Sequence, residues 1–187
     1  MIRIIAGKHK NRIIPTKKSS NYRPSTGKFR EAIFSILTSG EFLDNPILKG
    51  AKVLDLFAGT GSLAFEALSR GAASATLIDN VRVHLEDAKN FANLIGEADN
   101  VTALCVDACS LPKALYQYDL IFMDPPYHQN MVEKALTSLE QGEWLKKAAL
   151  IVIEVPKTQD IKLGPNMELK REKIYGNNKL IMLKYKL

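Results

Sequence analysis

The run VLDLFAGTGSLAFEALSRGA (53–72) constrains the fold of this chain more than any other segment. Its opening residues are apolar except for Asp55 and predict a buried strand. Residues 58–61, Ala-Gly-Thr-Gly, are typical of a tight turn, because glycine adopts backbone conformations that other residues avoid. Residues 62–70 then predict a helix that ends before Gly71. A strand, a glycine turn and a helix in this order bring backbone N–H groups close to a nucleotide-like ligand.

Strand and helix patterns alternate along residues 53–155, which predicts an α/β domain with a mostly parallel sheet. Two further segments around Gly176 predict an antiparallel hairpin near the end of the chain. Together they predict one Rossmann-like, seven-stranded sheet. The expected strands are 53–58, 74–79, 101–107, 119–124, 149–155, 168–175 and 179–185. The expected helices are 27–39, 62–70, 81–95, 109–116 and 130–140.

The net charge of +6 is unevenly distributed along the chain. Residues 1–30 hold nine Lys or Arg residues and no acidic residue. Residues 31–161 hold ten basic and eighteen acidic residues, whereas residues 162–187 hold seven basic and two acidic ones. A basic extension on an acidic body is typical of a protein that binds a polyanion.

The basic N-terminal segment carries signs of ordered structure. Short apolar segments lie on either side of Gly7, which predicts a hairpin in place of a disordered basic tail. The following helix, with Thr26 as its candidate N-cap, has an apolar stripe that we expect to pack on the body of the protein. The stripe consists of Phe29, Ile33, Ile36 and Leu37. We therefore expect residues 1–40 to form a basic extension and residues 41–187 to form the main domain.

Length and composition exclude several classes of protein. The chain has 187 residues, 46% of them hydrophobic, which is enough for the core of one domain. No apolar run approaches the ~20 residues that span a bilayer, and the charged start of the chain does not fit a secretory signal. Cys105 and Cys109 are too few for a disulfide framework, so we expect two buried, reduced thiols and no metal site. These features predict a cytoplasmic protein, for which we expect a monomer.

The run Asp124-Pro125-Pro126-Tyr127 follows the apolar segment 119–123 and is typical of a site that holds a flat, amino-bearing base. The Asp124 carboxylate can accept hydrogen bonds from an exocyclic amine. The two prolines stiffen the loop and leave its carbonyl groups free to accept hydrogen bonds. Tyr127 offers a face for stacking, worth about 1–3 kcal/mol per base. The alternative interpretation is a proline turn that caps a buried strand, since Asp-Pro favours turns.

Two cofactors compete for the glycine turn. The turn fits the G-x-G-x-x-G/A dinucleotide fingerprint, and Asp79 lies about 20 residues further along, as expected for a nicotinamide dinucleotide. Asp55 argues against that cofactor, because a carboxylate at the end of the strand repels a pyrophosphate. S-adenosylmethionine has no phosphate, and Asp55 would attract its ammonium and sulfonium groups.

Acidic residues follow the other expected strands as well. Asp79 can bind ribose hydroxyls under either hypothesis, and Asp107 can accept a hydrogen bond from an adenine amino group. A single Asp after a strand is often only a helix N-cap. Asp55, Asp79, Asp107 and Asp124 stand at four successive strand ends, however, and this repetition favours one shared ligand crevice.

These motifs resemble the RsmD family of bacterial 16S ribosomal RNA (guanine-N2)-methyltransferases, which use S-adenosylmethionine. The resemblance covers nearly the whole chain, and the opening and 23–37 segments are the most family-specific. Gly27 stands where the family usually has an acidic residue, and Val106 stands where a small residue is frequent. The segments that carry the resemblance are IRIIAGKHKNRII (2–14), RPSTGKFREAIFSIL (23–37), LDLFAGTGSLAFEALSRGA (54–72), DPPY (124–127) and REKIYGNNKLIMLKY (171–185).

The resemblance implies a methyltransferase that acts on the exocyclic N2 amine of a guanine in 16S ribosomal RNA, in the assembled or assembling small ribosomal subunit. The expected catalytic residues are Asp124, Pro125, Pro126 and Tyr127. The residues expected to bind S-adenosylmethionine are Asp55, Phe57, Ala58, Gly59, Thr60, Gly61, Asp79, Asn80, Asp107 and Ala108. The basic residues expected to contact RNA are Arg3, Lys8, Lys10, Arg12, Arg23, Lys28 and Arg30.

Three other functions fit part of the sequence. A DNA amino-methyltransferase acting on adenine N6 or cytosine N4 would use the same DPPY motif, but the chain has no spare segment for a separate DNA-reading domain. A non-catalytic RNA-binding module would not need Asp55, Asp79 and Asp124. A nicotinamide-dependent enzyme is disfavoured by Asp55 and by the lack of a hydride-transfer acid or base near DPPY.

Overall fold

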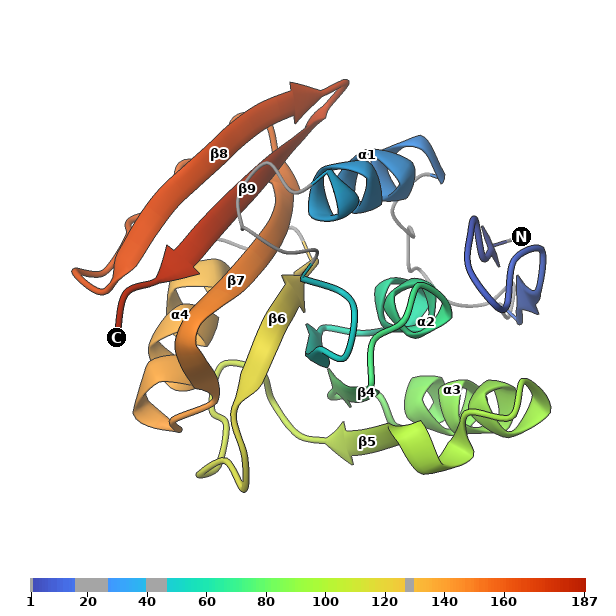
Figure 1. Ribbon diagram of the computed structural model, residues 1–187. Coiled ribbons are helices and arrows are strands. Elements are labelled where there is room, and N and C mark those ends of the chain that lie inside the picture. The colour runs from blue at the N-terminus through green and yellow to red at the C-terminus, as the bar shows by residue number, and fades with distance from the viewer. Residues whose placement is uncertain (1, 16–26, 40–46, 127–129) are drawn as a thin grey trace.

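A seven-stranded sheet forms the centre of the computed structural model, which describes residues 2–15, 27–39, 47–126 and 130–187 (Figure 1). The strand order is β5-β4-β3-β6-β7-β9-β8. The first five strands in this order are parallel, and β9 pairs antiparallel with both β7 and β8. This arrangement confirms the predicted sheet. The strands are β3 (Lys52–Leu56), β4 (Ser74–Asp79), β5 (Val101–Cys105), β6 (Tyr118–Met123), β7 (Leu145–Pro156), β8 (Met167–Tyr175) and β9 (Asn178–Tyr185).

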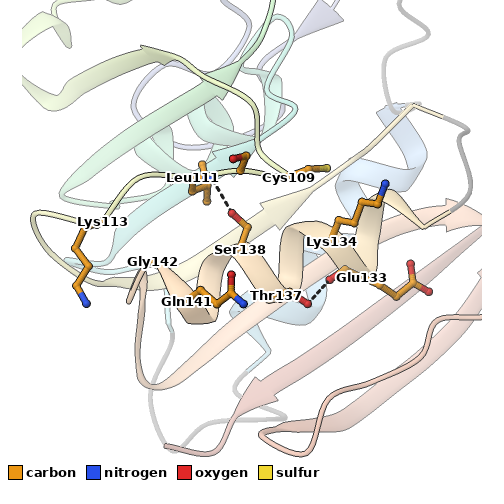
Figure 2. A pocket seen from close by; sticks show the side chains of 10 residues that line it. Cys109, Leu111, Lys113, Glu133, Lys134, Thr137, Ser138, Gln141 and Gly142 are labelled. Carbon is orange, nitrogen blue, oxygen red and sulfur yellow. Dashed lines mark hydrogen bonds between the residues drawn. The ribbon is translucent and has the colours of Figure 1, made fainter.

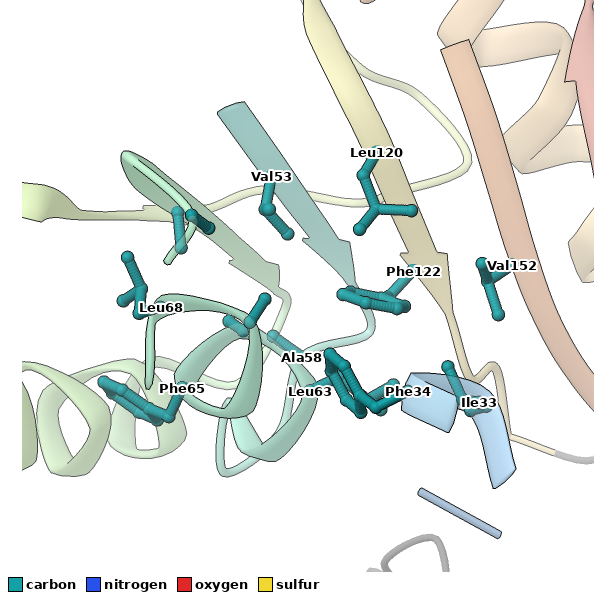
Figure 3. Close-up of a cluster of buried hydrophobic side chains, with 14 of the residues drawn as sticks. Ile33, Phe34, Val53, Ala58, Leu63, Phe65, Leu68, Leu120, Phe122 and Val152 are labelled. Atoms are coloured by element: carbon teal, nitrogen blue, oxygen red, sulfur yellow. The ribbon is translucent and has the colours of Figure 1, made fainter. Parts of the chain in front are cut away.

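Helices cover both faces of the sheet (Figure 1). On one face, α1 (Gly27–Thr38), α2 (Ser62–Ser69) and α3 (Arg82–Leu94) share a buried apolar cluster with the sheet. On the other face, α4 (Met131–Gln141) packs against a second cluster. Figure 3 shows the first cluster where Ile33 and Phe34 of α1 meet Phe122 of β6 and Val152 of β7. The predicted apolar stripe of α1 is confirmed, since its four residues are all buried.

The helix predicted over residues 109–116 is wrong, because this segment is an irregular connection. Pro112 lacks the N–H group that a helix interior requires. The backbone instead bonds to the region of α4: the Leu111 N–H donates to Ser138 Oγ (2.7 Å), and the Ala114 N–H donates to the Gly142 carbonyl (2.8 Å). The Trp144 indole N–H donates to the Pro112 carbonyl (2.8 Å). Figure 2 shows Ser138 of α4 directed at Leu111.

The expected burial of the two cysteines is also wrong. Cys105 is exposed and Cys109 is half-buried, and both are free thiols. Cys105 ends β5, which is the edge strand of the sheet, and Cys109 lies in the irregular connection that follows it. Among the described residues, no helix is both long and apolar enough to cross a bilayer.

The N-terminal segment forms the predicted hairpin, in which β1 (Ile2–Arg3) pairs antiparallel with β2 (Ile13–Ile14). The hairpin lies against the C-terminal part of α2. The Lys8 N–H donates to the Ser69 carbonyl (2.8 Å), and Ser69 Oγ accepts from the His9 N–H (2.9 Å). A Cβ atom at Gly7 would lie 1.8 Å from the Ser69 carbonyl oxygen, so this contact requires glycine.

Candidate active site

The candidate site lies where the direction of chain progression across the sheet reverses. β3 has β4 on one side and β6 on the other, both parallel to it. The connections that follow these three strands therefore all begin at the carboxyl-terminal ends of the parallel strands, on one side of the sheet. In open α/β sheets such a switch point forms a crevice that binds ligands. The glycine turn and Asp124 follow β3 and β6 at this end of the sheet, and Asp79 is the last residue of β4.

The glycine turn begins with backbone strain at a residue that is not glycine. Phe57 has φ of 58°, a conformation that is uncommon for a bulky residue. Gly61 has φ of 71°, and a Cβ atom there would lie 2.5 Å from Leu77 Cδ2, so the turn packs closely on β4. Thr60 Oγ1 is buried and has no hydrogen-bond partner among the described residues. A ligand with a polar group at this turn would satisfy that hydroxyl.

Asp79 joins the turn to the start of α3. Its Oδ2 accepts a hydrogen bond from the Gly59 N–H (2.7 Å), and its Oδ1 accepts one from the Val81 N–H (2.8 Å). His84 Nδ1 lies 3.5 Å from the same Oδ1. These bonds hold the carboxylate in one orientation at the mouth of the crevice, where it is 9% exposed.

Asp55 is a buried carboxyl group on the same face of the sheet. Its Oδ2 accepts a hydrogen bond from the Ala64 N–H of α2 (3.1 Å), and the residue is 2% exposed. Burial raises the pKa of Asp55 well above its ordinary value; the Ala64 bond opposes this shift, and the nearby charges of Asp124 and Asp79 add to it. The site therefore favours a proton or a cationic ligand group at this position.

The remaining predicted cofactor residues are less enclosed. Asp107 is exposed, and its Oδ1 accepts a hydrogen bond from the Cys109 N–H (2.8 Å), so one oxygen already caps the local backbone. Asn80 is exposed, and its carbonyl faces the Cys105 thiol (3.8 Å). Ala108 is buried beside them. These residues follow β4 and β5 and lie toward the open edge of the sheet.

The DPPY motif is described only in part. Asp124 follows β6 and is half-buried, Pro125 is buried and Pro126 is exposed. Tyr127 lies outside the described residues. Asp124 comes directly after Met123, which pairs with Leu56 of β3, the residue next to Asp55. The charge of Asp124 accordingly contributes to the raised pKa of Asp55. The structure thus brings together three of the four predicted acidic groups: Asp55, Asp79 and Asp124.

The basic residues predicted to contact RNA fall into different environments. Arg3, Lys10, Arg12 and Lys28 are exposed, whereas Arg23 lies outside the described residues. Lys8 Nζ pairs with Glu97 Oε1 (2.5 Å), although its side chain remains 53% exposed. The expected exposure of Arg30 is wrong: it is 3% exposed and donates a hydrogen bond from Nη2 to the Arg3 carbonyl (3.1 Å). It faces inward because it lies three and four residues before the buried Ile33 and Phe34, on the same side of α1.

Buried acids that hold the N-terminal hairpin were not predicted from the sequence. Glu66 is fully buried, and Glu97, which is 2% exposed, accepts hydrogen bonds from His9 Nε2 (2.5 Å) and Asn100 Nδ2 (2.8 Å). Burial opposes ionisation of Glu97, but bonds from Lys8, His9 and Asn100 lower its pKa to about 2. The sequence signals the contact between the hairpin and α2 only through Gly7, since a glycine in a turn can mark a place where the backbone packs closely on another element.

Two further observations show what lies outside the candidate site. A polar groove of about 430 Å³ lies between the 109–113 segment and α4, with Lys113 and Lys134 among its lining residues (Figure 2). Its lining includes neither the glycine turn nor Asp124. In the part of the chain that the structure describes, no group of three His, Cys, Asp or Glu residues is placed to hold a metal ion.

Known proteins resemble this chain over nearly its whole length. The family model described as Conserved hypothetical protein 95 matches residues 2–184. The uncharacterized methylase RP545 of Rickettsia prowazekii (strain Madrid E) is 41% identical over 231 aligned positions, which cover 99% of this chain and 98% of that protein. The ribosomal RNA small subunit methyltransferase D of Escherichia coli (strain K12) is 37% identical over 178 residues, covering 94% and 85%. The solved structure of yhhF from Escherichia coli has a TM-score of 0.83 at 31% identity, covering 100% and 98%.

Proposed function

This chain belongs to the RsmD family, and we propose that it transfers a methyl group from S-adenosylmethionine to the exocyclic N2 amine of a guanine in 16S ribosomal RNA. The observation that carries the proposal is the meeting of the glycine turn, Asp79 and Asp124 at one switch point of the sheet. The name of the Escherichia coli relative supports a small-subunit RNA substrate. The choice of guanine N2 follows from the family resemblance. We expect the protein to act as a cytoplasmic monomer on the assembled or assembling subunit.

The residues of the crevice fit the proposed cofactor. S-adenosylmethionine supplies a methyl group on a positively charged sulfur, which is already activated for transfer. Asp79 is fixed by two backbone N–H groups, and we propose that its carboxylate also accepts hydrogen bonds from the ribose hydroxyls. The buried Thr60 hydroxyl lacks a partner among the described residues, and Asp55 favours a cationic group. Asp107 keeps one carboxylate oxygen that is not used by the Cys109 N–H and can accept from an adenine amine.

Asp124 and Pro125 are proposed to orient the target amine. The lone pair of guanine N2 is delocalised into the ring, so the free amine is a poor nucleophile. Hydrogen bonds from the two N2 hydrogens to the Asp124 carboxylate and the Pro125 carbonyl would favour a pyramidal nitrogen. They would also stabilise the positive charge that develops there, so they are stronger in the transition state than before it. The nitrogen loses one proton after transfer, and Asp124 is its nearest proposed acceptor.

The basic extension of residues 1–40 is proposed to hold the RNA. Arg3, Lys10, Arg12 and Lys28 are exposed and can contact phosphates. Tyr127 is proposed to stack on the flipped base, as enzymes that modify bases commonly do with an aromatic side chain. A small extension of this kind has few groups with which to read a long sequence. A folded subunit that presents one base therefore fits it better than free RNA.

Transfer of labelled methyl groups tests the proposal. Small subunits that lack this modification, naked 16S RNA and duplex DNA are incubated separately with labelled S-adenosylmethionine, and the labelled nucleoside is identified. We expect N2-methylguanosine from the subunit or the RNA. Label only in DNA would favour the DNA amino-methyltransferase. Cofactor binding without any transfer would favour the non-catalytic RNA-binding module.

A further inference from the structure

Glu154 lies beside the DPPY motif, on the strand next to it. β6 and β7 are parallel, and Met123 pairs with Ile153 in their register. Asp124 directly follows the end of β6, and Glu154 is the next residue of β7. Continuing the same register by one residue sets Asp124 opposite Glu154, at about the 4.8 Å spacing of neighbouring strands. None of the sequence motifs pointed to Glu154, because a lone acidic residue inside an apolar strand carries no pattern.

Glu154 belongs to the face of the sheet that α1 covers, because side chains alternate along a strand and Glu154 stands two residues after Val152 in β7. Asp124 stands two residues after Phe122, so the same alternation, extended one residue past β6, directs it to this face. Phe122 and Val152 both belong to the buried cluster on the α1 face, and Figure 3 shows them beside Ile33 of α1. Met123 and Ile153 belong to the cluster on the opposite face.

Glu154 is held in place by Asn178. Glu154 is 6% exposed, and its Oε1 accepts a hydrogen bond from Asn178 Nδ2 (2.5 Å). Asn178 begins β9 and pairs with Pro156 of β7, so the bond joins two strands at the edge where β6 ends. An acidic side chain with a fixed orientation is thus placed next to Asp124, on the side away from Asp79 and the cofactor turn.

We propose that Glu154 selects guanine by accepting the hydrogen bond of its N1–H, while Asp124 binds the adjacent N2 amine and Asn178 positions the Glu154 side chain. This inference rests on the proposed function. In guanine the N1–H and N2–H groups are neighbouring donors on the Watson–Crick edge, which is the edge that enzymes read in a flipped base. Two neighbouring carboxylates match two neighbouring donors.

The same arrangement rejects the other amino-bearing bases. In adenine the ring nitrogen next to the amine is N1, and in cytosine it is N3; both carry a lone pair and no hydrogen. That lone pair would face the Glu154 carboxylate. The ring nitrogen and the carboxylate oxygen are both acceptors, so they could not form a hydrogen bond and would repel each other. A site built to bind a donor rejects an analogue that lacks it far more strongly than an apolar pocket would.

The test removes the N1–H donor from the base and, separately, replaces the Glu154 carboxylate of the protein with an amide. Reconstituted small subunits carry either guanine or 2-aminopurine at the modified position; 2-aminopurine keeps the amine but has no hydrogen on N1. The wild-type protein should methylate guanine at least 10-fold more efficiently, by kcat/KM, than 2-aminopurine. Glu154→Gln should lower kcat/KM for guanine about 10- to 100-fold. The same variant should reduce or reverse the preference for guanine over 2-aminopurine, because the Gln amide can donate a hydrogen bond to the unprotonated N1 of 2-aminopurine.

A matched control and a binding measurement separate the possible failures. Glu140→Gln makes the same change on α4, on the other face of the sheet, and should leave the preference unchanged. S-adenosylmethionine affinity should be the same in all three proteins. If Glu154→Gln lowered kcat/KM equally for both bases, the inference would be overturned. It would also be overturned if the wild-type protein methylated 2-aminopurine with the same efficiency as guanine, a result that needs no variant. Wild-type protein that methylates neither subunit would instead refute the proposed function, and the inference with it.

Discussion

Glu66 Oε2 accepts a hydrogen bond from the Ile5 N–H at 2.7 Å, which joins positions 61 residues apart in the sequence. Glu66 Oε1 accepts two more, from the Ala6 N–H (3.0 Å) and from Arg70 Nε (2.7 Å). The carboxylate is therefore both buried and satisfied, as a buried charge must be. Because Glu66 belongs to the helix that follows the glycine turn, the basic hairpin and the proposed cofactor site share one rigid support.

Gly7→Ala should displace this hairpin. The new Cβ atom would lie 1.8 Å from the backbone oxygen of Ser69, and the φ of 85° disfavours any L side chain. We expect a loss of about 2–4 kcal/mol in the free energy of unfolding and weaker RNA binding. Urea denaturation and a binding titration measure the two effects. Gly27→Ala is the matched control, since its Cβ meets nothing within 4 Å, and a similar loss in that variant would contradict this reasoning.

Asp55→Asn should change how stability depends on pH. Because the pKa of Asp55 is raised in the folded protein, its contribution to stability is complete below the unfolded pKa of about 3.9 and is lost as pH rises through the folded pKa. The asparagine keeps an oxygen for the Ala64 N–H and cannot ionise. The variant should therefore gain stability relative to wild type as pH rises from acid to neutral. Denaturation curves over that range that stay parallel would show that Asp55 does not titrate as expected.

The affinity for S-adenosylmethionine should depend on Asp79. Asp79→Ala removes the acceptor proposed for the ribose hydroxyls and frees the Gly59 and Val81 N–H groups. Loss of hydrogen bonds to a charged group costs about 1.5–3 kcal/mol, so the Kd should rise about 10- to 100-fold. Isothermal titration calorimetry measures this directly. An unchanged Kd would refute the ribose assignment.

Asp124→Ala should affect the chemical step instead. Removal of a group that stabilises developing charge lowers kcat by about 10²- to 10³-fold. The Kd for S-adenosylmethionine should stay within a few-fold of wild type, because the cofactor residues follow β3, β4 and β5. Single-turnover transfer and calorimetry on the same preparation separate the two. A weakened Kd with unaltered transfer at saturating cofactor would mean that Asp124 binds the cofactor.

RNA binding should weaken with salt in proportion to the number of phosphate contacts. Arg3, Lys10, Arg12 and Lys28 are the predicted basic residues that are exposed and have no ion pair with Glu97. With about 0.7–0.9 counterions released per contact, four contacts give a slope of roughly −2.8 to −3.6 in log affinity against log salt. Filter binding over a series of salt concentrations measures the slope. A flat response would remove electrostatics from the account of RNA binding.

The centre of the sheet could be predicted because β3, β4 and β6 are buried on both faces and have nearly continuous apolar sequences. β4 begins and ends at the predicted residues, whereas β3 stops at Leu56, two residues early, where Phe57 takes a positive φ. In the 109–116 segment Pro112 argues against a helix, but the course that the segment takes could not be predicted, because its hydrogen bonds go to Ser138 and Gly142, which follow it in the chain. Local periodicity does not contain that information.

The site shows the same division. Asp55, Asp79 and Asp124 could be found because each lies in or directly after the last part of an apolar strand, and the carboxyl ends of parallel strands lie together. The burial of Arg30 could not be found, because charge alone predicts exposure and only the packing of α1 turns this side chain inward. Glu66 and Glu154 were missed for a related reason: an acidic residue within an apolar segment gives no sign of which backbone or side chain satisfies it.

The length of α2 has a consequence for substrate choice. The helix has 8 residues, so at 1.5 Å per residue it spans roughly 12 Å between the glycine turn and the hairpin contact at Ser69. Under the proposed function, the length of this helix sets the distance between the phosphates that the hairpin contacts and the methyl donor. One added helical turn would move the hairpin by about 5.4 Å relative to the glycine turn. The identity of the modified base would then be fixed by a length as well as by the groups that read it.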